Sequence, residues 1–580
     1  MIRPIDLLRQ GRKEELWQMC CGFIDLSLEQ FMDIQKRLLL EQIELLKNCE
    51  LGRRIMRGAA PETVEEFREM VPLTTYADYC PELLERKEDV LPAKPVHWVH
   101  TLGKLGESLY RKDVLPAESA YWMRILGRFG EYLCKWVPMS EDFLSEYEKV
   151  AGALPFLASC HGRGDISQLK EHAKTFYTVG PPKYASGFLA YSVQQAIGYD
   201  FLPSDGEELS FQERIKAGFE EALYRGMDSV NGIPSVLVYV GEQIKQQSGK
   251  INIRLLLSHP SALLRVTRAS IKSKLAHRPM LPKDLWSVKV ITIGGTDAAI
   301  FRKGVKELWG REPLEVYAGA EGGVYATQTW DYEGMTFIPN LNFFEFIPER
   351  EWFKWQLDHS YQPKTILLDE VKAGENYEIV ITNLHGGIMT RYRIGDMVRI
   401  TSLRNGKLNI DIPQMVFHGR GDELIDITGF GRITEKIIWQ AVENTGILYV
   451  DWTARKEVIG EKPALHIYLE LEDGYIASEQ VVASAVYEEL RKLDKVYRYN
   501  IYSAYGDPES VLGFKPIQVS FLPQGAFSRY MAQRQAEGAD LGHLKPPHVN
   551  PSDKVLSLLG APRVAVEAVP TPEAERAATR

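Results

Sequence analysis

The sequence predicts an α/β protein with a large N-terminal domain, built on a mixed or parallel sheet, and a small C-terminal α+β domain. In the middle of the chain, short β-branched runs alternate with helical patterns, the order expected of one partly parallel sheet. From about residue 423 the pattern changes to two amphipathic helices and two short strands. The 580 residues are 45% hydrophobic and 25% charged, as in ordinary globular proteins.

Helices are expected first along the chain. Residues 14–50 place leucines and isoleucines at helical spacing, and residues 71–85 indicate a loop followed by a helix. Apolar residues spaced i, i+4, i+7 and i+8 over 301–309 predict a one-faced helix between two strands. The candidate strands of the large domain are 236–240, 288–293, 314–317, 366–368 and 379–382.

The small domain is expected to begin with a helix. Thr434 is a candidate N-cap, the apolar face lies within 437–442, and Gly446 is a candidate helix stop. A strand at 465–471, a second amphipathic helix over 482–493 and a strand at 519–522 follow. The last thirty or so residues are rich in Ala, Pro and Glu and predict a flexible tail. The expected domains are therefore 1–422 and 423–550, with a tail at 551–580.

Composition excludes several classes of function. The net charge is −9 with no Lys/Arg block, so nucleic acid is not an expected partner. No stretch approaches ~18 apolar residues and the N-terminus has no apolar signal core, so neither a membrane partner nor secretion is expected. The six cysteines form no C-x-x-C pair, which favours reduced thiols in a cytoplasmic protein. Nothing in the sequence predicts the oligomeric state.

A short internal repeat lies near the N-terminal third. Residues 86–107 and 110–131 share ten of twenty-two residues at a constant offset of 24, and each copy ends in L-G-[KR]-x-G-E. Glycines at this spacing let backbone amides approach a phosphate closely. Gly127, Arg128 and Gly130 are therefore candidate phosphate-binding residues, although a plain turn between strands explains the same pattern.

Three further motifs place polar residues in turns. Glu321 follows a predicted strand in YAGAEGG (317–323), where a carboxylate can reach a nucleotide-bound metal. Asp396 lies in TRYRIGDMVRI (390–400), where a carboxylate can accept hydrogen bonds from ribose hydroxyls. Arg420 lies in the Gly-rich bend at which the composition changes. Taken singly, a surface glutamate, a turn-forming aspartate and a linker explain these residues equally well.

The order of the motifs resembles that of the adenylate-forming superfamily, and most closely the auxin-responsive acyl-acid amido synthetases (the Gretchen Hagen family). The resemblance covers about residues 70–548. The segments that carry it, in chain order, are VPLTTY (71–76), KWVP (135–138), YAGAE (317–321), FEFIP (344–348), RYRIGD (391–396), GRGD (419–422) and GADLGHLK (538–545). The resemblance implies a large adenylate-forming domain and a small domain that rotates about a hinge near residues 420–434.

The resemblance also implies a reaction and its residues. ATP and a small carboxylic acid would give an acyl-adenylate with Mg²⁺, and an amine, usually an amino acid, would then displace AMP. Glu321 would lie near the magnesium, Asp396 would hold the ribose, Arg420 would assist at the ribose or hinge, and Lys545 would act at the α-phosphate. The remaining nucleotide-binding positions would be Gly127, Arg128, Gly130, Lys135, Tyr317, Gly319 and Ala320.

The sequence departs from the family where the phosphate loop is expected. Ile125 and Leu126 replace hydroxyl residues, Arg128 and Phe129 replace two threonines, and Ala320 replaces a serine. Removing one hydrogen-bond donor that stabilises charge in the transition state lowers the rate by about 10²–10³-fold. Either Arg128 or Lys104 compensates in an active enzyme, or the protein binds ligands without adenylating them. An acyl-CoA ligase of the phenylacetate–CoA ligase type, with coenzyme A as acceptor, is a third possibility.

Overall fold

The computed structural model shows two compact units, each of which is described by itself. The first comprises residues 1–298 and 302–419, and the second comprises residues 299–301 and 420–580. The boundary at 419/420 lies beside the one expected at 422. The residues that the structure describes are 2–100, 135–168, 170–178, 184–206, 209, 211–246, 258–295, 298–357, 360–420, 424–427, 431–459, 462–496, 509, 513–536 and 546–562.

The first unit opens with short helices around one long one. Residues 14–50 are helical as predicted, but they divide into α2 (Lys13–Cys21), α3 (Leu28–Lys47) and α4 (Glu50–Ile55). Ser27 begins α3, because its hydroxyl accepts from the Gln30 amide while the Gln30 side chain accepts from the Ser27 N–H. Gln35, buried on α3, donates to the carbonyl of Asn342, which fastens this helix to the sheet.

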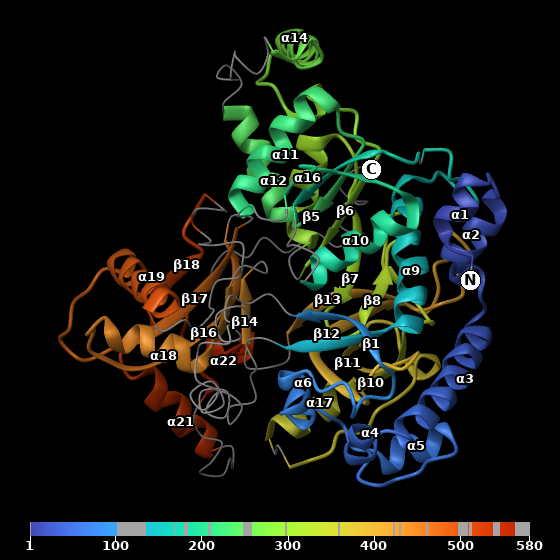
Figure 1. The fold of residues 1–580 in the computed structure, drawn as a ribbon. Helices are drawn as coiled ribbons and strands as arrows, with labels where there is room; N and C mark the ends of the chain where they lie inside the picture. The colour runs from blue at the N-terminus through green and yellow to red at the C-terminus, as the bar shows by residue number, and fades with distance from the viewer. Residues whose placement is uncertain are drawn as a thin grey trace. The chain divides into compact units, whose positions relative to one another are not determined.

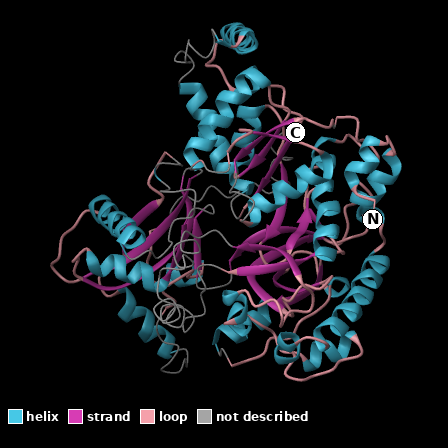
Figure 2. Ribbon diagram, viewed as in Figure 1, coloured by secondary structure: helices cyan, strands magenta, loops and turns pink. Residues whose placement is uncertain are grey.

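An eleven-stranded mixed sheet forms the centre of the first unit (Figures 1 and 2). At one end β4, β3, β5, β6 and β7 run parallel, whereas β7–β8, β8–β9, β9–β13 and β10–β11–β12 pair antiparallel. The predicted α/β class is confirmed. In sheet order the strands are β10 (Asn342–Pro348), β11 (Asn376–Asn383), β12 (Tyr392–Ser402), β13 (Gln414–Arg420), β9 (Met335–Phe337), β8 (Gly323–Thr327), β7 (Leu314–Gly319), β6 (Val290–Gly294), β5 (Ser229–Gly232), β3 (Lys174–Thr178) and β4 (Asp200–Leu202).

Helices cover the sheet and separate its parallel strands. The helix α9 (Glu141–Ser159) packs against β6, β7 and β8, and α10 (Ala185–Ile197) packs against α9 (Figure 1). Between β6 and β7 lies α16 (Ala298–Trp309), the one-faced helix predicted from the sequence. The strands predicted at 288–293, 314–317 and 379–382 are likewise present as β6, β7 and β11.

Two predicted strands were wrong. Residues 236–240 lie in the helix α12 (Pro234–Gln246), whose buried Val236, Leu237, Val240 and Ile244 recur at helical spacing. A β-branched run of five residues cannot distinguish a buried strand from a helix face, and the proline at the helix start was the missed signal. Residues 366–368 contribute only an isolated bridge from Ile366 to Phe346, after which a 3₁₀ turn begins.

The second unit contains a three-stranded sheet in the order β16 (Tyr449–Ile459), β17 (Lys462–Leu471), β18 (Ile517–Phe521). The helices α18 (Glu435–Asn444) and α19 (Glu479–Val496) pack against each other, as the two amphipathic patterns predicted. Their apolar faces and those of β16 and β17 share one core, which includes Ile438, Val486 and Ile467. Gly446 follows α18 with φ of 71°, in the left-handed region that favours glycine.

The strand β16 was not predicted, because charged residues interrupt its apolar pattern. Those charges are paired: Glu457 accepts hydrogen bonds from Arg455, from Tyr468 on β17 and from the buried ring of His466. Burial alone would raise the pKa of Glu457, but these hydrogen bonds outweigh it and lower that pKa to about 2. Charged residues buried in this way interrupt the alternation of apolar and polar residues by which a strand is recognised in a sequence.

Part of the segment 551–580, predicted to be a flexible tail, is helical. The helix α22 (Asp553–Leu558) begins at Ser552, whose hydroxyl accepts from the Val555 amide. Leu556 and Leu559 are buried in a cluster with Tyr468 and Phe527. Residues 563–580 lie outside the described residues. Among the helices that the structure describes, none is long and apolar enough to cross a membrane.

Candidate active site

The hairpin between β7 and β8 positions Glu321. Gly319 pairs with Gly323 across the hairpin, and residues 320–322 form the turn. Two buried asparagines hold that turn: Asn383 donates to the Glu321 carbonyl at 2.9 Å, and Asn342 donates to the Gly322 carbonyl at 2.7 Å. Because β10 and β11 supply these amides, the main chain of the turn is fixed by the antiparallel part of the sheet.

The carboxylate of Glu321 meets a lysine from far away in the chain. The Nζ of Lys135, just before β2 (Trp136–Ser140), donates to Glu321 Oε1 and to Tyr392 Oη, each at 2.9 Å. The ammonium also lies 5.9 Å from the centre of the Tyr76 ring and 5.6 Å from that of Tyr392. Lys135 and Glu321 are both largely buried, so their charges are little screened by solvent.

The segment 71–76 holds this lysine in place. The Tyr76 hydroxyl accepts from the Trp136 amide at 2.6 Å and donates to the Trp136 carbonyl at 2.9 Å. Thr74 is fixed in turn, because its amide donates to the Arg391 carbonyl and its own carbonyl accepts from the Arg393 amide, both at 2.9 Å. The motifs VPLTTY, KWVP, YAGAE and RYRIGD therefore come together around one ion pair.

Asp396 lies on β12 and is buried. The Tyr317 hydroxyl, reaching from β7, donates to Asp396 Oδ2 at 2.8 Å. The ring of Phe417, on β13, lies 6.1 Å from that of Tyr317. A carboxylate only accepts hydrogen bonds, so Asp396 has the chemistry needed to bind vicinal hydroxyls.

Tyr325, on β8, carries a buried hydroxyl for which the described residues supply no hydrogen-bond partner. Burial, and then the carboxylates of Glu321 and Asp396, raise the pKa of Tyr325 well above its ordinary value. The ring lies 5.0 Å from that of Tyr317. A buried hydroxyl to which no described residue is hydrogen-bonded is a group that a polar ligand can satisfy.

Gly319 is expected to be required for this packing. A Cβ at residue 319 would lie 2.6 Å from the Tyr325 hydroxyl and 3.0 Å from a ring carbon. We expect Gly319→Ala to lower the free energy of unfolding by about 1–3 kcal/mol, because the ring must shift within a packed core. Denaturant unfolding measures this. Adding Tyr325→Phe should recover part of the loss, since it removes the overlapping oxygen; no recovery would contradict the steric explanation.

The structure brings together some of the residues predicted from the sequence. Lys135 contacts Glu321, and Tyr317 contacts Asp396, whereas Gly319 and Ala320 shape the turn between β7 and β8. Arg420 ends β13 and begins the second unit. Gly127, Arg128, Gly130 and Lys545 lie outside the described residues. Sequence reasoning missed Tyr76, Tyr392 and Tyr325, although the first two stand inside quoted motifs.

In the second unit, His548 anchors the segment that follows Lys545. Its ring nitrogens lie 2.6 Å from Glu435 Oε1 and 2.9 Å from Asp451 Oδ1, and its ring stacks on Trp452. The main chain joins β16, because the Ala454 amide donates to the His548 carbonyl at 2.7 Å.

The contacts of His548 with Asp451 and Glu435 should weaken at alkaline pH. The hydrogen bonds with Asp451 and then Glu435 raise the pKa of His548 to about 9, above its ordinary value of 6.5. A raised folded-state pKa means that the stabilisation is complete below pH 6.5 and is lost as pH rises through about 9. We expect the stability of the second unit to fall over this window, and His548→Gln to remove that dependence. Unfolding curves at several pH values measure this change in stability. If His548→Gln keeps the same pH dependence, a group other than His548 causes it.

Known proteins resemble this chain in two ways. The GH3 family N-terminal domain matches residues 20–101, and the GH3 family central domain matches residues 335–420. The jasmonoyl–L-amino acid synthetase JAR4 of Nicotiana attenuata is 30% identical over 233 residues, which are 39% of this chain and 37% of the relative. The 4-substituted benzoates–glutamate ligase GH3.12 of Arabidopsis thaliana is 26% identical over 240 residues, 39% of this chain and 38% of the relative. The aligned part thus spans less than two fifths of either relative.

Solved structures extend the likeness over nearly the whole chain. The acyl acid amido synthetase AtGH3.15, in complex with 2,4-DB, has a TM-score of 0.51 at 16% identity and covers 97% of this chain and 99% of its own. A 2-hydroxyisobutyryl-CoA ligase, in complex with 2-HIB-AMP and CoA, has a TM-score of 0.52 at 12% identity and covers 92% of both chains. At these identities the likeness concerns the fold.

The fold is thus similar to that of an acyl acid amido synthetase and to that of an acyl-CoA ligase. Residues 20–101 and 335–420 match domains of the GH3 family, and the amido synthetase relatives are similar to about two fifths of the chain, so the chain resembles the GH3 family, the auxin-responsive acyl-acid amido synthetases. The resemblance read from the motif order is confirmed.

Proposed function

We propose that the protein is an ATP-dependent acyl-acid amido synthetase. An acid carboxylate attacks the α-phosphorus of ATP, giving an acyl-adenylate and pyrophosphate. An amine, in this proposal an amino acid, then attacks the acyl carbon and AMP leaves. The observation that supports this most strongly is the buried contact of Lys135 with Glu321 and Tyr392, which joins three motifs of the family at one place.

The residues present fit a nucleotide with its magnesium. Mg²⁺ on a nucleotide usually takes one or two carboxylates and completes its shell with phosphate oxygens and water. Glu321 offers one carboxylate, and the described residues contain no cluster of three or more His, Cys, Asp or Glu that would hold a metal by itself. Bound magnesium would neutralise negative charge on the phosphates. Asp396 would accept from the ribose hydroxyls, and Arg420 would lie beside the ribose or the hinge.

We propose that Lys135 supplies part of the stabilisation of phosphate charge that the altered phosphate loop lacks. Its ammonium is fixed by a carboxylate and a phenol, so it is preorganised to meet phosphate oxygens as charge develops on them. Arg128 and the amides of Gly127 and Gly130 would complete the phosphate site. Lys545 would approach the α-phosphate when the small domain rotates. This arrangement favours an active enzyme over a protein that only binds ligands.

ATP–pyrophosphate exchange with a panel of carboxylic acids tests the proposal. We expect exchange with at least one acid, dependence on Mg²⁺, and an amide product when amino acids are added. The names of the relatives favour the amide, whereas the fold alone is equally compatible with a thioester. Formation of a thioester with coenzyme A and no amide would replace the proposal with an acyl-CoA ligase. ATP binding by calorimetry with no exchange for any acid would favour a degenerate binding protein.

A further inference from the structure

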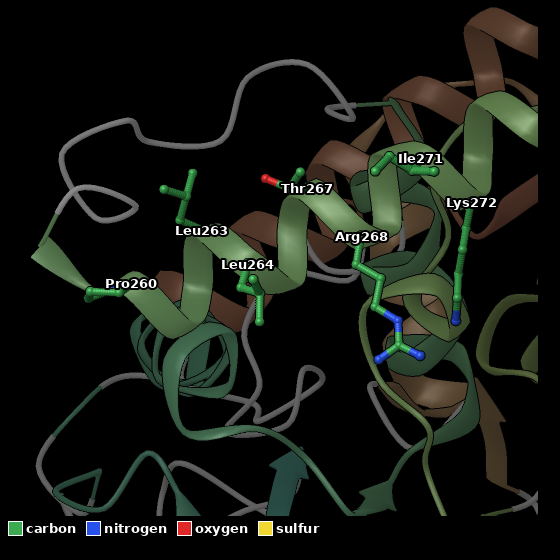
Figure 3. Close-up of a pocket in the computed structure, with 7 residues that line it drawn as sticks. All are labelled: Pro260, Leu263, Leu264, Thr267, Arg268, Ile271 and Lys272. Atoms are coloured by element: carbon green, nitrogen blue, oxygen red, sulfur yellow. The ribbon is translucent and has the colours of Figure 1, made fainter.

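The helix α14 (Pro260–Leu275) exposes an unusual number of large apolar side chains. Leu264 and Leu275 are 75% and 77% exposed, and Ile271 is 55% exposed. Leu263, on the same helix, is 45% exposed. Leu263, Leu264 and Ile271 help to line a shallow hollow of about 590 Å³ (Figure 3). None of these residues belongs to the candidate active site.

The apolar strip lies opposite the face by which α14 is attached. Leu264, Ile271 and Leu275 are spaced by seven and four residues, so they share one side of the helix. Ala262, Ala269 and Ser273 are buried, and each lies two positions before a residue of the strip. Two positions correspond to a rotation of about 200° around the helix axis, so the buried residues lie on the opposite side. The helix packs on α11 (Phe211–Arg225) and α15 (Pro282–Leu285). The strip therefore points away from the unit.

Basic residues border the strip on both sides. At about 100° per residue, Arg268 and Lys272 lie on one side of it and Lys274 on the other, and all three are exposed. Arg265 lies nearer the attached face, where its guanidinium donates to the Leu223 carbonyl. The sixteen residues of α14 include four basic and no acidic side chains, although the whole chain has a net charge of −9. The positive charge is thus local to this helix.

We propose that the outer face of α14 is a docking surface for an anionic membrane. Apolar side chains between two rows of basic ones match the boundary between acyl chains and phosphate headgroups, where long basic side chains reach back to the headgroups. The helix lies flat on the surface and binds reversibly, because four apolar side chains and a few basic ones give only modest affinity. This contact goes beyond the proposed amido synthetase activity and does not involve a membrane span.

The charge pattern argues against a second copy as the occupant. In a symmetric dimer through this face, each partner would present the same surface to the other. The basic rows of two copies of α14 would then face each other without an acidic partner in either helix, which is repulsive. Anionic lipid supplies the missing negative charge.

Co-sedimentation with vesicles tests the proposal on the full chain. We expect binding to vesicles that contain phosphatidylserine, little binding to pure phosphatidylcholine, and weakening as salt rises. Leu264→Asp with Ile271→Asp should lower the bound fraction at least tenfold. Arg268→Gln with Lys272→Gln should lower affinity for the anionic vesicles about 25-fold, at about fivefold for each basic residue. As a matched control, Leu403→Asp, at a residue 50% exposed elsewhere on the first unit, should bind like the unchanged protein.

Three outcomes overturn the proposal. The unchanged protein fails to bind phosphatidylserine vesicles, the double aspartate variant binds as well as the unchanged protein, or the control loses binding equally. A concentration-dependent dimer that becomes monomeric in Leu264→Asp with Ile271→Asp, with no vesicle binding, would assign the surface to a second copy. Circular dichroism of each variant separates loss of the surface from loss of the fold.

Discussion

Replacing Glu321 with glutamine is expected to lower ATP–pyrophosphate exchange by about 10²–10³-fold, the usual cost of removing one group that acts on transition-state charge. The amide cannot serve as an anionic metal ligand, and it leaves the Lys135 ammonium without its counter-charge. The fold should survive, since the amide oxygen still accepts from Lys135, and we expect a loss of only about 1–2 kcal/mol in unfolding free energy. Exchange rates and denaturant unfolding, measured on the same preparation, separate the two effects.

Glu351→Gln is the matched control. Glu351 is also a buried carboxylate paired with a lysine, because Lys354 Nζ lies 2.6 Å from its Oε1, but it lies on α17 (Glu349–Leu357) outside the candidate site. The ATP–pyrophosphate exchange rate of Glu351→Gln should stay within about threefold of that of the unchanged protein. If Glu321→Gln keeps its exchange rate while folding normally, Glu321 has no role at magnesium or phosphate, and the proposed site is wrong at its centre.

The sequence was sufficient to predict the fold class and the positions of the motifs, but not the contacts between them. Lys135 and Glu321 are 186 residues apart, and nothing local in either motif predicts that their charges meet at 2.9 Å. The asparagines that hold the turn, Asn342 and Asn383, lie at the ends of β10 and β11, where nothing in the sequence distinguishes them from other polar residues at strand ends. Periodicity also fails over short apolar runs, as with residues 236–240 in α12, since five residues fit a strand and a helix face alike.

The same limit applies to what each motif residue does. The motif FEFIP contains a glutamate, Glu345, whose carboxylate the structure places in a bidentate ion pair with Arg391. The Arg391 Nε and Nη2 atoms lie 3.0 and 2.7 Å from the two oxygens of Glu345. Arg391 also donates to the carbonyls of Arg68 and Val71, and Thr365 donates to Glu345 at 2.6 Å. The pair fastens β10, β12 and the N-terminal segment together.

Breaking this pair should produce the largest stability loss of any single change considered. The Glu345 and Arg391 side chains are only 1% and 6% exposed, so Glu345→Gln leaves a buried guanidinium without its counter-ion, which costs about 3–5 kcal/mol. The midpoint of denaturant unfolding of the first unit measures this. Arg37 and Glu41 form an exposed pair on α3 at 2.8 Å, with side chains 62% and 59% exposed, and Glu41→Gln should change stability by no more than about 0.5 kcal/mol.

The double variant Glu345→Leu with Arg391→Met decides between two accounts of the pair. If the cost of Glu345→Gln is that of an uncompensated buried charge, removing both charges should restore most of the stability, because apolar replacements of similar size often match a buried ion pair. Recovery will be incomplete to the extent that the carbonyls of Arg68 and Val71 lose their donor. A double variant as unstable as the single one would mean that the hydrogen bonds of Arg391 to the main chain, and not its charge, hold the VPLTTY segment against the sheet.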